Sequence, residues 1–385
     1  MPEFSRPVPS KLPHVGTTIF TVMSRLAAEH HAINLSQGFP DFNCAPRLVD
    51  LVTQHMKAGH NQYPPMAGEA SLRDAIAEKV EQLYGARYDP EHEITVTAGA
   101  TQAIFTAIMA VAGHGDEVLV FEPAYDSYVP AIELAGATPV YVSLAYPDFR
   151  IDFDALEQSI TPRTRVIMIN SPTNPTGTVF PAEDLRRLEQ RLAGSGIIVI
   201  SDEVYEHIVF DGEQHQSAAR FPELADRSFI VSSFGKTYHV TGWKIGYCLA
   251  PRALMAEFRK VHQFNVFTCN TPVQLALGEF LHDREQYLQL AAFYEKKRDC
   301  FRDAIAASRF ELQPCRGTYF QCVRYDAITD EPDADFALRL TRENGVAAIP
   351  VSAFYREPPP HRILRFCFAK SEDTLARGAD ILCRI

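Results

Sequence analysis

The sequence lacks any run of about 18 apolar residues, the length that a membrane-spanning helix needs. Residues 1–20 are rich in proline and contain no apolar core typical of a secretion signal. Basic residues are not clustered, and the formal net charge is −11, whereas a nucleic-acid-binding surface needs concentrated lysine and arginine. We therefore expect a cytoplasmic protein that binds neither membranes nor nucleic acids.

The chain also lacks paired cysteines. Its eight cysteines are scattered, with no C-x-x-C pair and no spacing typical of metal ligands, which predicts free thiols and no metal site. No low-complexity tract is present, and 46% of the residues are hydrophobic, which indicates a folded globular protein. A length of 385 residues exceeds what one simple core accommodates and suggests two domains.

Short β-branched runs alternate with helical segments from about Glu93 onward, a pattern that predicts a mostly parallel sheet with helices on both faces. The expected strands are 94–98, 117–121, 165–170, 196–201, 228–233 and 244–250, and the clearest helices are 101–112 and 182–193. A charged helical stretch at 284–308 precedes short strand-like runs, which predicts a smaller α+β domain. We expect a large domain at 45–282 and a small domain formed by 1–44 and 283–385.

Two charged residues follow predicted strands, where ligands bind in open α/β sheets. Asp202 ends an apolar run, so its buried carboxylate needs a cation or several donors; an N-cap of a following helix fits this position equally well. Lys236 follows the next run, with Ser233 before it and Lys244 after it. A lysine among other cations and apolar walls has a lowered pKa and can act as a nucleophile.

Two loops complete this set. Gly99, Ala100 and Thr101 open a predicted helix, and small residues there let backbone N–H groups approach an anion, although they also serve tight turns. Asn174 lies in SPTNPTG, where two prolines stiffen the chain and can present an amide at fixed geometry, although most such loops are plain turns.

Together and in this order, GATQ, NSPTNPTG, SDEVY, SSFGKTYHVTGWKIGY and RFCF resemble the class I/II aminotransferases, which are pyridoxal 5'-phosphate (PLP) enzymes of fold type I. The resemblance extends from INLSQGFPDF at 33–42 to the C-terminal strand. The runs SKLPHVGTTIF, NLSQGFPDF and NQYPPMAG are most similar to bacterial methionine aminotransferases, which are related to kynurenine and glutamine transaminases. The resemblance implies the large α/β domain and smaller α+β domain expected above.

The resemblance assigns roles around the cofactor PLP. Lys236 would hold it as a Schiff base and then transfer protons, and Asp202 would pair with its pyridine nitrogen. Tyr205 and Asn174 would hydrogen-bond its 3'-oxygen. Tyr125 would stack on the ring, the alternative being a half-buried core aromatic.

The resemblance also implies a phosphate site and a second chain. The backbone N–H groups of Ala100 and Thr101 would bind the phosphate together with Ser233 and Lys244. Many relatives have arginine in place of Lys244; lysine keeps the charge but lacks the bidentate fork. Tyr63 resembles a tyrosine that reaches the phosphate of a partner subunit, which implies a homodimer with shared active sites.

The substrate would be an amino acid, followed by a 2-oxo acid. Arg365 would bind the α-carboxylate, helped by Asn174 and the backbone of Gly38. Three apolar residues would line the side-chain pocket: Ile19, Phe20 and Phe39. No second cation for a side-chain carboxylate is evident, which favours methionine, converted to 4-methylthio-2-oxobutanoate, or another neutral or aromatic amino acid.

Three alternatives remain at this point. A kynurenine or aromatic aminotransferase and a PLP-dependent C–S β-lyase would use the same residues. A non-catalytic sensor fused to a DNA-binding domain is disfavoured, because the roughly 30 residues before INLSQGFPDF contain no basic helix-turn-helix pattern.

Overall fold

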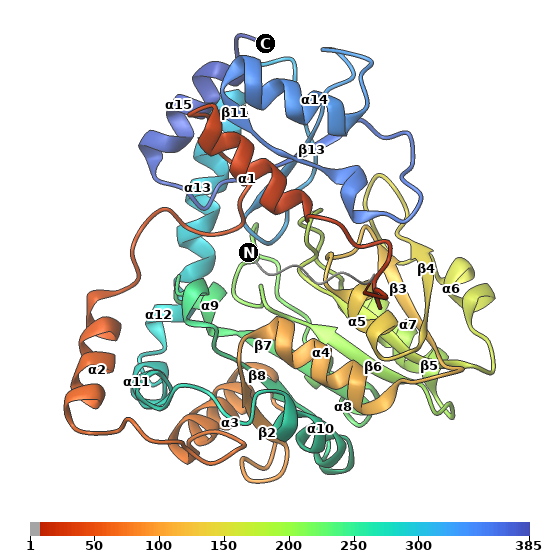
Figure 1. Ribbon diagram of the computed structural model, residues 1–385, viewed down its shortest axis with the longest axis vertical. Helices are drawn as coiled ribbons and strands as arrows, with labels where there is room; N and C mark the ends of the chain where they lie inside the picture. Colours follow the sequence, from red (N-terminus) through yellow and green to blue (C-terminus); the bar gives the residue numbers. More distant parts are fainter. Residues whose placement is uncertain (1–7) are drawn as a thin grey trace.

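The computed structural model describes residues 8–385, so residues 1–7 of the predicted N-terminal arm lie outside the described part (Figure 1). Its centre is a seven-stranded sheet of order β2-β8-β7-β6-β5-β3-β4. The strands are β2 (Ile94–Thr97), β3 (Glu117–Glu122), β4 (Thr138–Ser143), β5 (Thr164–Asn170), β6 (Ile198–Asp202), β7 (Ser228–Ser233) and β8 (Gly246–Leu249). Only β8 runs antiparallel to its neighbours in this sheet, which confirms the predicted mostly parallel architecture.

The sequence prediction missed β4. This edge strand contains Pro139 and is half-exposed, so it lacks the continuous apolar run by which the central strands were found. The other six predicted strands of the sheet are present within a few residues of their expected bounds.

Alternate residues of each central strand pack on opposite faces of the sheet. In β5, Val166 and Met168 join one buried cluster, while Ile167 and Ile169 join another. The first cluster packs under α4 (Ala100–Val111), α5 (Tyr128–Leu134) and α10 (Arg252–Asn265). Two buried faces explain why these strands read as continuous apolar runs.

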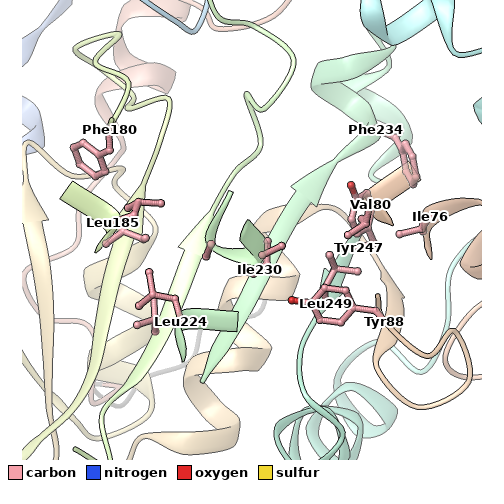
Figure 2. Packing of buried hydrophobic residues seen from close by; sticks show 14 of the residues in the cluster. Ile76, Val80, Tyr88, Phe180, Leu185, Leu224, Ile230, Phe234, Tyr247 and Leu249 are labelled. Carbon is pink, nitrogen blue, oxygen red and sulfur yellow. The ribbon is translucent and has the colours of Figure 1, made fainter. Parts of the chain in front are cut away.

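The opposite face packs against a larger set of helices, partly shown in Figure 2. These helices are α3 (Ala70–Tyr84), α6 (Phe153–Ser159), α7 (Ala182–Leu192), α8 (Pro222–Ala225) and α11 (Thr271–Leu281), while α2 (Pro46–Lys57) lies on α11. The predicted apolar face of α7 is buried through Leu185, Leu188 and Leu192. Helix α9 (Phe234–Thr237) follows β7 directly and carries Lys236.

A second hydrophobic core joins the two ends of the chain. Helix α1 (Ile19–Glu29) and β1 (Ile33–Asn34) pack with the C-terminal region, and β1 pairs with β11 (Val346–Ala347). An antiparallel sheet contains β9 (Glu311–Leu312), β10 (Phe320–Arg324), β12 (Ile349–Pro350) and β13 (Ile363–Cys367). The helices are α12 (Glu285–Leu288), α13 (Leu290–Ile305), α14 (Asp333–Arg339) and α15 (Glu372–Leu382).

In Figure 1, α1, α13, α14 and α15 all appear above the large sheet. The predicted helical stretch 284–308 consists of α12 and α13, which meet at Gln289. The domain bounds at 44/45 and 282/283 stay predictions.

All eight cysteines are free thiols. Within residues 8–385, no helix is long and apolar enough to cross a bilayer, and no group of three His, Cys, Asp or Glu side chains could hold a metal ion.

Candidate active site

A cavity of about 310 Å³ opens at the carboxyl ends of the central strands. Asn170, Asp202 and Ser233 line it and are the last residues of β5, β6 and β7. This is the edge of a parallel sheet where side chains from neighbouring strands converge. Its wall contains most of the residues singled out in the sequence: Phe20, Gly38, Ala100, Thr101, Tyr125, Asn174, Asp202, Tyr205, Ser233, Lys236, Lys244 and Arg365.

Three predicted residues do not line this cavity. Ile19 is half-buried against the second core, and the side chain of Phe39 is 46% exposed. Tyr63 is 83% exposed and packs edge-on against Phe267, beside a separate hollow lined by residues 61–64 and 268–272. Within one chain, Tyr63 therefore contributes nothing to the wall of the cavity.

Asp202 is buried without an ionic partner. Its Oδ2 accepts a hydrogen bond from the Tyr128 hydroxyl at 2.5 Å, and its Oδ1 accepts one from the Val204 N–H at 3.2 Å. Burial raises the pKa of the Asp202 carboxyl to about 6. No helix follows Asp202, so the N-cap alternative is wrong. Within residues 8–385, no basic side chain lies within ion-pair distance of Asp202.

Lys236 extends from α9 into the cavity. Its Nζ donates to the Tyr319 hydroxyl at 2.8 Å and to the Gly38 carbonyl at 3.2 Å. The ring of Tyr205 lies 5.6 Å from the amine. Burial lowers the pKa of Lys236 to about 8, which brings the neutral, nucleophilic amine within reach near physiological pH.

The N-terminus of α4 forms a cradle for an anion. Gly99 caps this helix with φ +78° and no side-chain hydrogen bond, which leaves first-turn N–H groups available. A Cβ on Gly99 would lie 3.4 Å from Lys244 Nζ, so that amine sits at the cradle. A Cβ on Gly246 would lie 3.2 Å from the Ala100 nitrogen and 2.6 Å from the Ser232 carbonyl oxygen, so only glycine permits this approach of β8 to α4.

Arg365, on β13, is fully buried. Its Nη1 donates to Asn174 Oδ1 at 2.7 Å and its Nη2 to the Ser36 carbonyl at 2.9 Å, while its Nε has no partner among residues 8–385. The guanidinium lies 3.8 Å from the ring centroid of Phe320. Burial lowers the pKa of Arg365, and no carboxylate among the described residues forms an ion pair with it. Such a cation suits an anionic ligand.

The structure adds residues that sequence reasoning missed. Tyr128 holds Asp202, Tyr319 contacts Lys236, and Phe320 lies against Arg365. Tyr128 follows Tyr125 by three residues in EPAYDSY and begins α5. The other two stand in GTYF, where Tyr319 precedes β10 and Phe320 begins it. Each motif contains aromatic residues next to a strand, but only the tertiary contacts distinguish them from core residues.

The wall fits the cofactor that the sequence predicts. An amine of lowered pKa can bond to an aldehyde, a buried carboxylate can face a protonated ring nitrogen, and the α4 cradle with Lys244 can bind a phosphate. Tyr125 lines the same cavity as Thr101, and burial raises its pKa to about 12. The unpartnered Nε of Arg365 remains for a carboxylate at the opposite end.

Comparison with known proteins places these residues in a family context. The family model "Aminotransferase class I and II" matches residues 30–382. A methionine aminotransferase of Escherichia coli is 51% identical over 374 residues, which cover 97% of each chain. A solved structure of an E. coli protein with methionine aminotransferase function, 50% identical, has a TM-score of 0.97 and covers 99% of this chain and 100% of that one.

More distant relatives cover most of the chain as well. The solved N-succinyldiaminopimelate aminotransferase of Mycobacterium tuberculosis is 38% identical, with a TM-score of 0.95 over 98% of this chain and 100% of that chain. Human kynurenine–oxoglutarate transaminase 1 is 35% identical over 389 residues, or 91% of this chain and 92% of that protein. The chain and its fold are thus similar to aminotransferases whose names give different substrates.

Proposed function

This chain belongs to the class I and II aminotransferase family, and from that premise we propose that it uses PLP to transfer the α-amino group of methionine to a 2-oxo acid. The product from methionine would be 4-methylthio-2-oxobutanoate, and other neutral or aromatic L-amino acids would also serve as donors. One observation carries the choice of donor: the cavity wall holds three basic side chains, Lys236, Lys244 and Arg365. Each has a use, so among the described residues of one chain none remains in the wall for a side-chain carboxylate.

The cofactor would be held at both ends. PLP, when bound, supplies an electron sink that stabilises negative charge at the substrate α-carbon. Lys236 would hold its aldehyde carbon covalently, and Asp202 would face its ring nitrogen, which supplies the cationic partner that the buried carboxylate lacks. The phosphate would lie on the N–H groups of Ala100 and Thr101, with Ser233 and Lys244 beside it.

The rest of the wall would orient the cofactor and the amino acid. Tyr125 would cover one face of the ring, and Tyr205 and Asn174 would donate to its 3'-oxygen. Arg365 would bind the α-carboxylate, with the Gly38 backbone close by, because its guanidinium is already fixed by Asn174.

The side-chain end of the cavity is apolar. Phe20 and Phe320 line it, and their rings flank the Arg365 guanidinium at 5.3 Å and 3.8 Å. A thioether or an aromatic ring packs well against such rings. Ile19 and Phe39 lie in segments next to wall residues Phe20 and Gly38 and would contribute to this pocket when the substrate is bound.

A second copy of the chain would complete each site. Three apolar or aromatic side chains are exposed here: Met56 on α2, Tyr63 in the loop after α2, and Phe264 on α10. Exposed side chains of this kind suit an interface between two copies of the chain. In a homodimer, Tyr63 would reach the phosphate of the partner's site. With eight free thiols, we also expect the enzyme to work in the reducing cytoplasm.

The test is a single half-reaction. L-Methionine alone is added to the purified, PLP-loaded enzyme, and the absorption spectrum and keto acid are followed together. We expect the cofactor to convert to its amine form with one equivalent of 4-methylthio-2-oxobutanoate. An unchanged spectrum with methionine would remove methionine as the donor.

An aromatic donor is the second candidate, favoured by the kynurenine transaminases among the relatives and by the two phenylalanines of the wall. The ratio of kcat/KM for methionine to that for kynurenine and phenylalanine separates the two. Sustained release of pyruvate from cystathionine without an oxo acid would instead identify a C–S β-lyase.

A further inference from the structure

Tyr319 lies beside the amine of Lys236 but has no role in the function proposed above. It is fully buried just before β10, with its ring edge-on to Tyr205 at a centroid distance of 5.1 Å. Its hydroxyl donates to the Gly38 carbonyl and accepts a hydrogen bond from Lys236 Nζ at 2.8 Å. The same carbonyl accepts a second hydrogen bond from the lysine at 3.2 Å.

We propose that Tyr319 is a positioning residue: with the Gly38 carbonyl it forms the resting place of the Lys236 amine whenever that amine is not covalently engaged. The proposal rests on the proposed transamination, in which the substrate amine displaces the lysine and the lysine then moves a proton. A free lysine has a flexible four-carbon stem and would otherwise sample many rotamers. Holding it in one place keeps its nitrogen close to the reacting atoms.

A tyrosine hydroxyl suits this task because it is a neutral acceptor. Its single proton is committed to Gly38, so a lone pair is directed at Lys236. A carboxylate here would pair with the ammonium ion and favour the charged form, whereas a base must be able to lose its proton. A phenylalanine would fill the space without accepting a hydrogen bond.

The resting place is built by segments remote from the lysine. Gly38 and Tyr319 belong to the part of the chain around the second core, while Lys236 follows β7 of the large sheet. A Cβ on Gly38 would lie 2.8 Å from Cζ of Phe320, so any larger residue at this position would push that ring aside next to Tyr319. The two acceptors therefore meet the lysine only when both parts of the chain are together.

Other groups around Lys236 also act on its protonation. Arg365 and Lys244 disfavour the ammonium ion, whereas Asp202 favours it. These three remain in place when only the Tyr319 hydroxyl is removed. A change in the titration of the lysine would then report on that hydroxyl.

The experiment compares Tyr319→Phe with Tyr294→Phe. Tyr294 is also buried and packs against Tyr319 at a centroid distance of 5.7 Å, and its hydroxyl has no hydrogen-bond partner in the described part of the chain. Each change removes one hydroxyl from the same cluster of packed aromatic side chains. In the cofactor-free proteins, competitive acetylation across a pH series, read by peptide mass spectrometry, gives the pKa of Lys236.

We expect Tyr319→Phe to lower the pKa of Lys236 by about one unit, the effect of one lost hydrogen bond to the ammonium ion, and Tyr294→Phe to leave it unchanged. In the loaded enzyme, Tyr319→Phe should reduce kcat for the best amino donor about 10-fold with KM nearly constant, because the hydroxyl contacts the lysine and not the substrate.

Equal lysine pKa values in the wild type and Tyr319→Phe would overturn the proposal, as would equal losses of activity in the two variants. Failure of the wild-type enzyme to transaminate any amino acid would refute the proposed function instead. The acetylation result in the cofactor-free protein does not depend on that outcome, so the two failures are distinguishable.

Discussion

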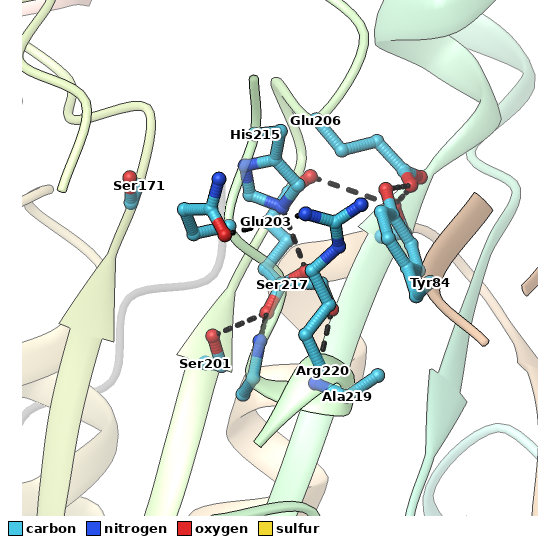
Figure 3. A network of polar contacts seen from close by, with 12 residues as sticks. Tyr84, Ser171, Ser201, Glu203, Glu206, His215, Ser217, Ala219 and Arg220 are labelled. Carbon is cyan, nitrogen blue, oxygen red and sulfur yellow. Dashed lines mark hydrogen bonds and ion pairs between the residues drawn. The ribbon is translucent and has the colours of Figure 1, made fainter. Parts of the chain in front are cut away.

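Asp202 and Glu203 are neighbours in the sequence, and both are buried, but they belong to different polar groups. Glu203 accepts hydrogen bonds from Ser201 at 2.7 Å and from the Ala218 N–H at 2.9 Å, and it contacts His215 at 2.9 Å (Figure 3). Asp202 faces the cavity, where Tyr128 is the only side-chain donor to its carboxylate within the described chain. Burial is thus common to both acids, whereas the number of partners differs.

The contrast between paired and unpaired buried charges extends to residues near Asp202 and Glu203. Lys79 and Glu206 form a buried ion pair at 2.7 Å; burial by itself would raise the pKa of Glu206, but Lys79 and His207 hold it well below its usual range. In the cavity, burial shifts the pKa of Asp202 up to about 6 and that of Lys236 down to about 8, toward their neutral forms. A buried ion pair indicates a structural role, whereas a buried ionisable group without an ionic partner indicates a ligand-binding site.

The largest expected effect tests the cavity side of this comparison. Lys236→Ala should abolish the hydride-reducible covalent link to PLP and lower the half-reaction rate by about 10⁴-fold, the upper range for loss of a proton-transfer group. Mass spectrometry after hydride reduction and stopped-flow spectra give both values. The exposed Lys260→Ala is the control and should keep the link. A retained link in Lys236→Ala would refute the assignment.

The next effect tests the paired side. Lys79→Met leaves Glu206 buried without its cation and should destabilise the protein by about 3–5 kcal/mol. Urea unfolding of the cofactor-free protein measures this, and the folded fraction should retain its activity. Adding Glu206→Leu should restore much of the stability, since an apolar pair replaces the ion pair. Unchanged unfolding in Lys79→Met would contradict the structural role of the pair.

The cavity residues and the buried Lys79–Glu206 pair also differ in how well they could be predicted from the sequence. Asp202, Lys236 and Arg365 stand in or next to apolar strands in motifs that together resemble one family. The sheet edge where Asp202 and Lys236 meet follows from the parallel strand order, whereas Arg365 comes from β13 of the antiparallel sheet. The Lys79–Glu206 pair joins α3 to the turn after β6, across 127 residues, and no local pattern signals such a contact. Residues 128 and 319 were missed for the same reason.

The edges of the fold were less predictable for a different reason. β4 is half-exposed, and β1, β11 and β12 contain two residues each, too short for a period-2 pattern to appear. The central strands, buried on both faces, left the continuous apolar runs from which the sheet was predicted. Tertiary pairing, not local propensity, sets the short strands.

A smaller effect concerns pH. Between about pH 4 and about pH 6, Asp202 stays protonated in the folded protein but is ionised in an unfolded chain. The free energy of unfolding of the cofactor-free protein should therefore fall as the pH rises through this range, by at most about 3 kcal/mol. Asp202→Asn removes this loss, so the variant should be more stable than the wild type at pH 8 and similar near pH 4.

The paired acid should behave in the opposite way. The pKa of Glu206 is lowered, so its charge stabilises the folded state above the unfolded pKa, and that contribution is lost as the pH falls. Glu206→Gln should therefore be less stable than the wild type at pH 8. Thermal unfolding of the cofactor-free proteins across a pH series measures the stability of both variants. If Asp202→Asn and Glu206→Gln changed the stability at pH 8 in the same direction, the distinction between the unpaired and the paired acid would be wrong.

The smallest effect separates two buried arginines. Arg298 is paired with Asp211 at 2.7 Å and Asp299 at 2.8 Å, whereas Arg365 has only neutral partners. Arg365→Lys keeps the charge but loses the planar fork, and should raise KM for methionine about 10- to 100-fold with little change in kcat, because the α-carboxylate is bound in both the ground and the transition state.

Arg298→Lys is the matched control. It should lower the unfolding midpoint and leave KM unchanged, since Arg298 is satisfied by carboxylates of the protein itself. Steady-state kinetics and urea unfolding of both variants provide the comparison. If Arg365→Lys changed only stability, the arginine would be a structural partner of Asn174, and the amino acid carboxylate would have to bind elsewhere in the cavity. The wall offers only Lys244 as another unengaged cation, and that amine lies at the phosphate cradle.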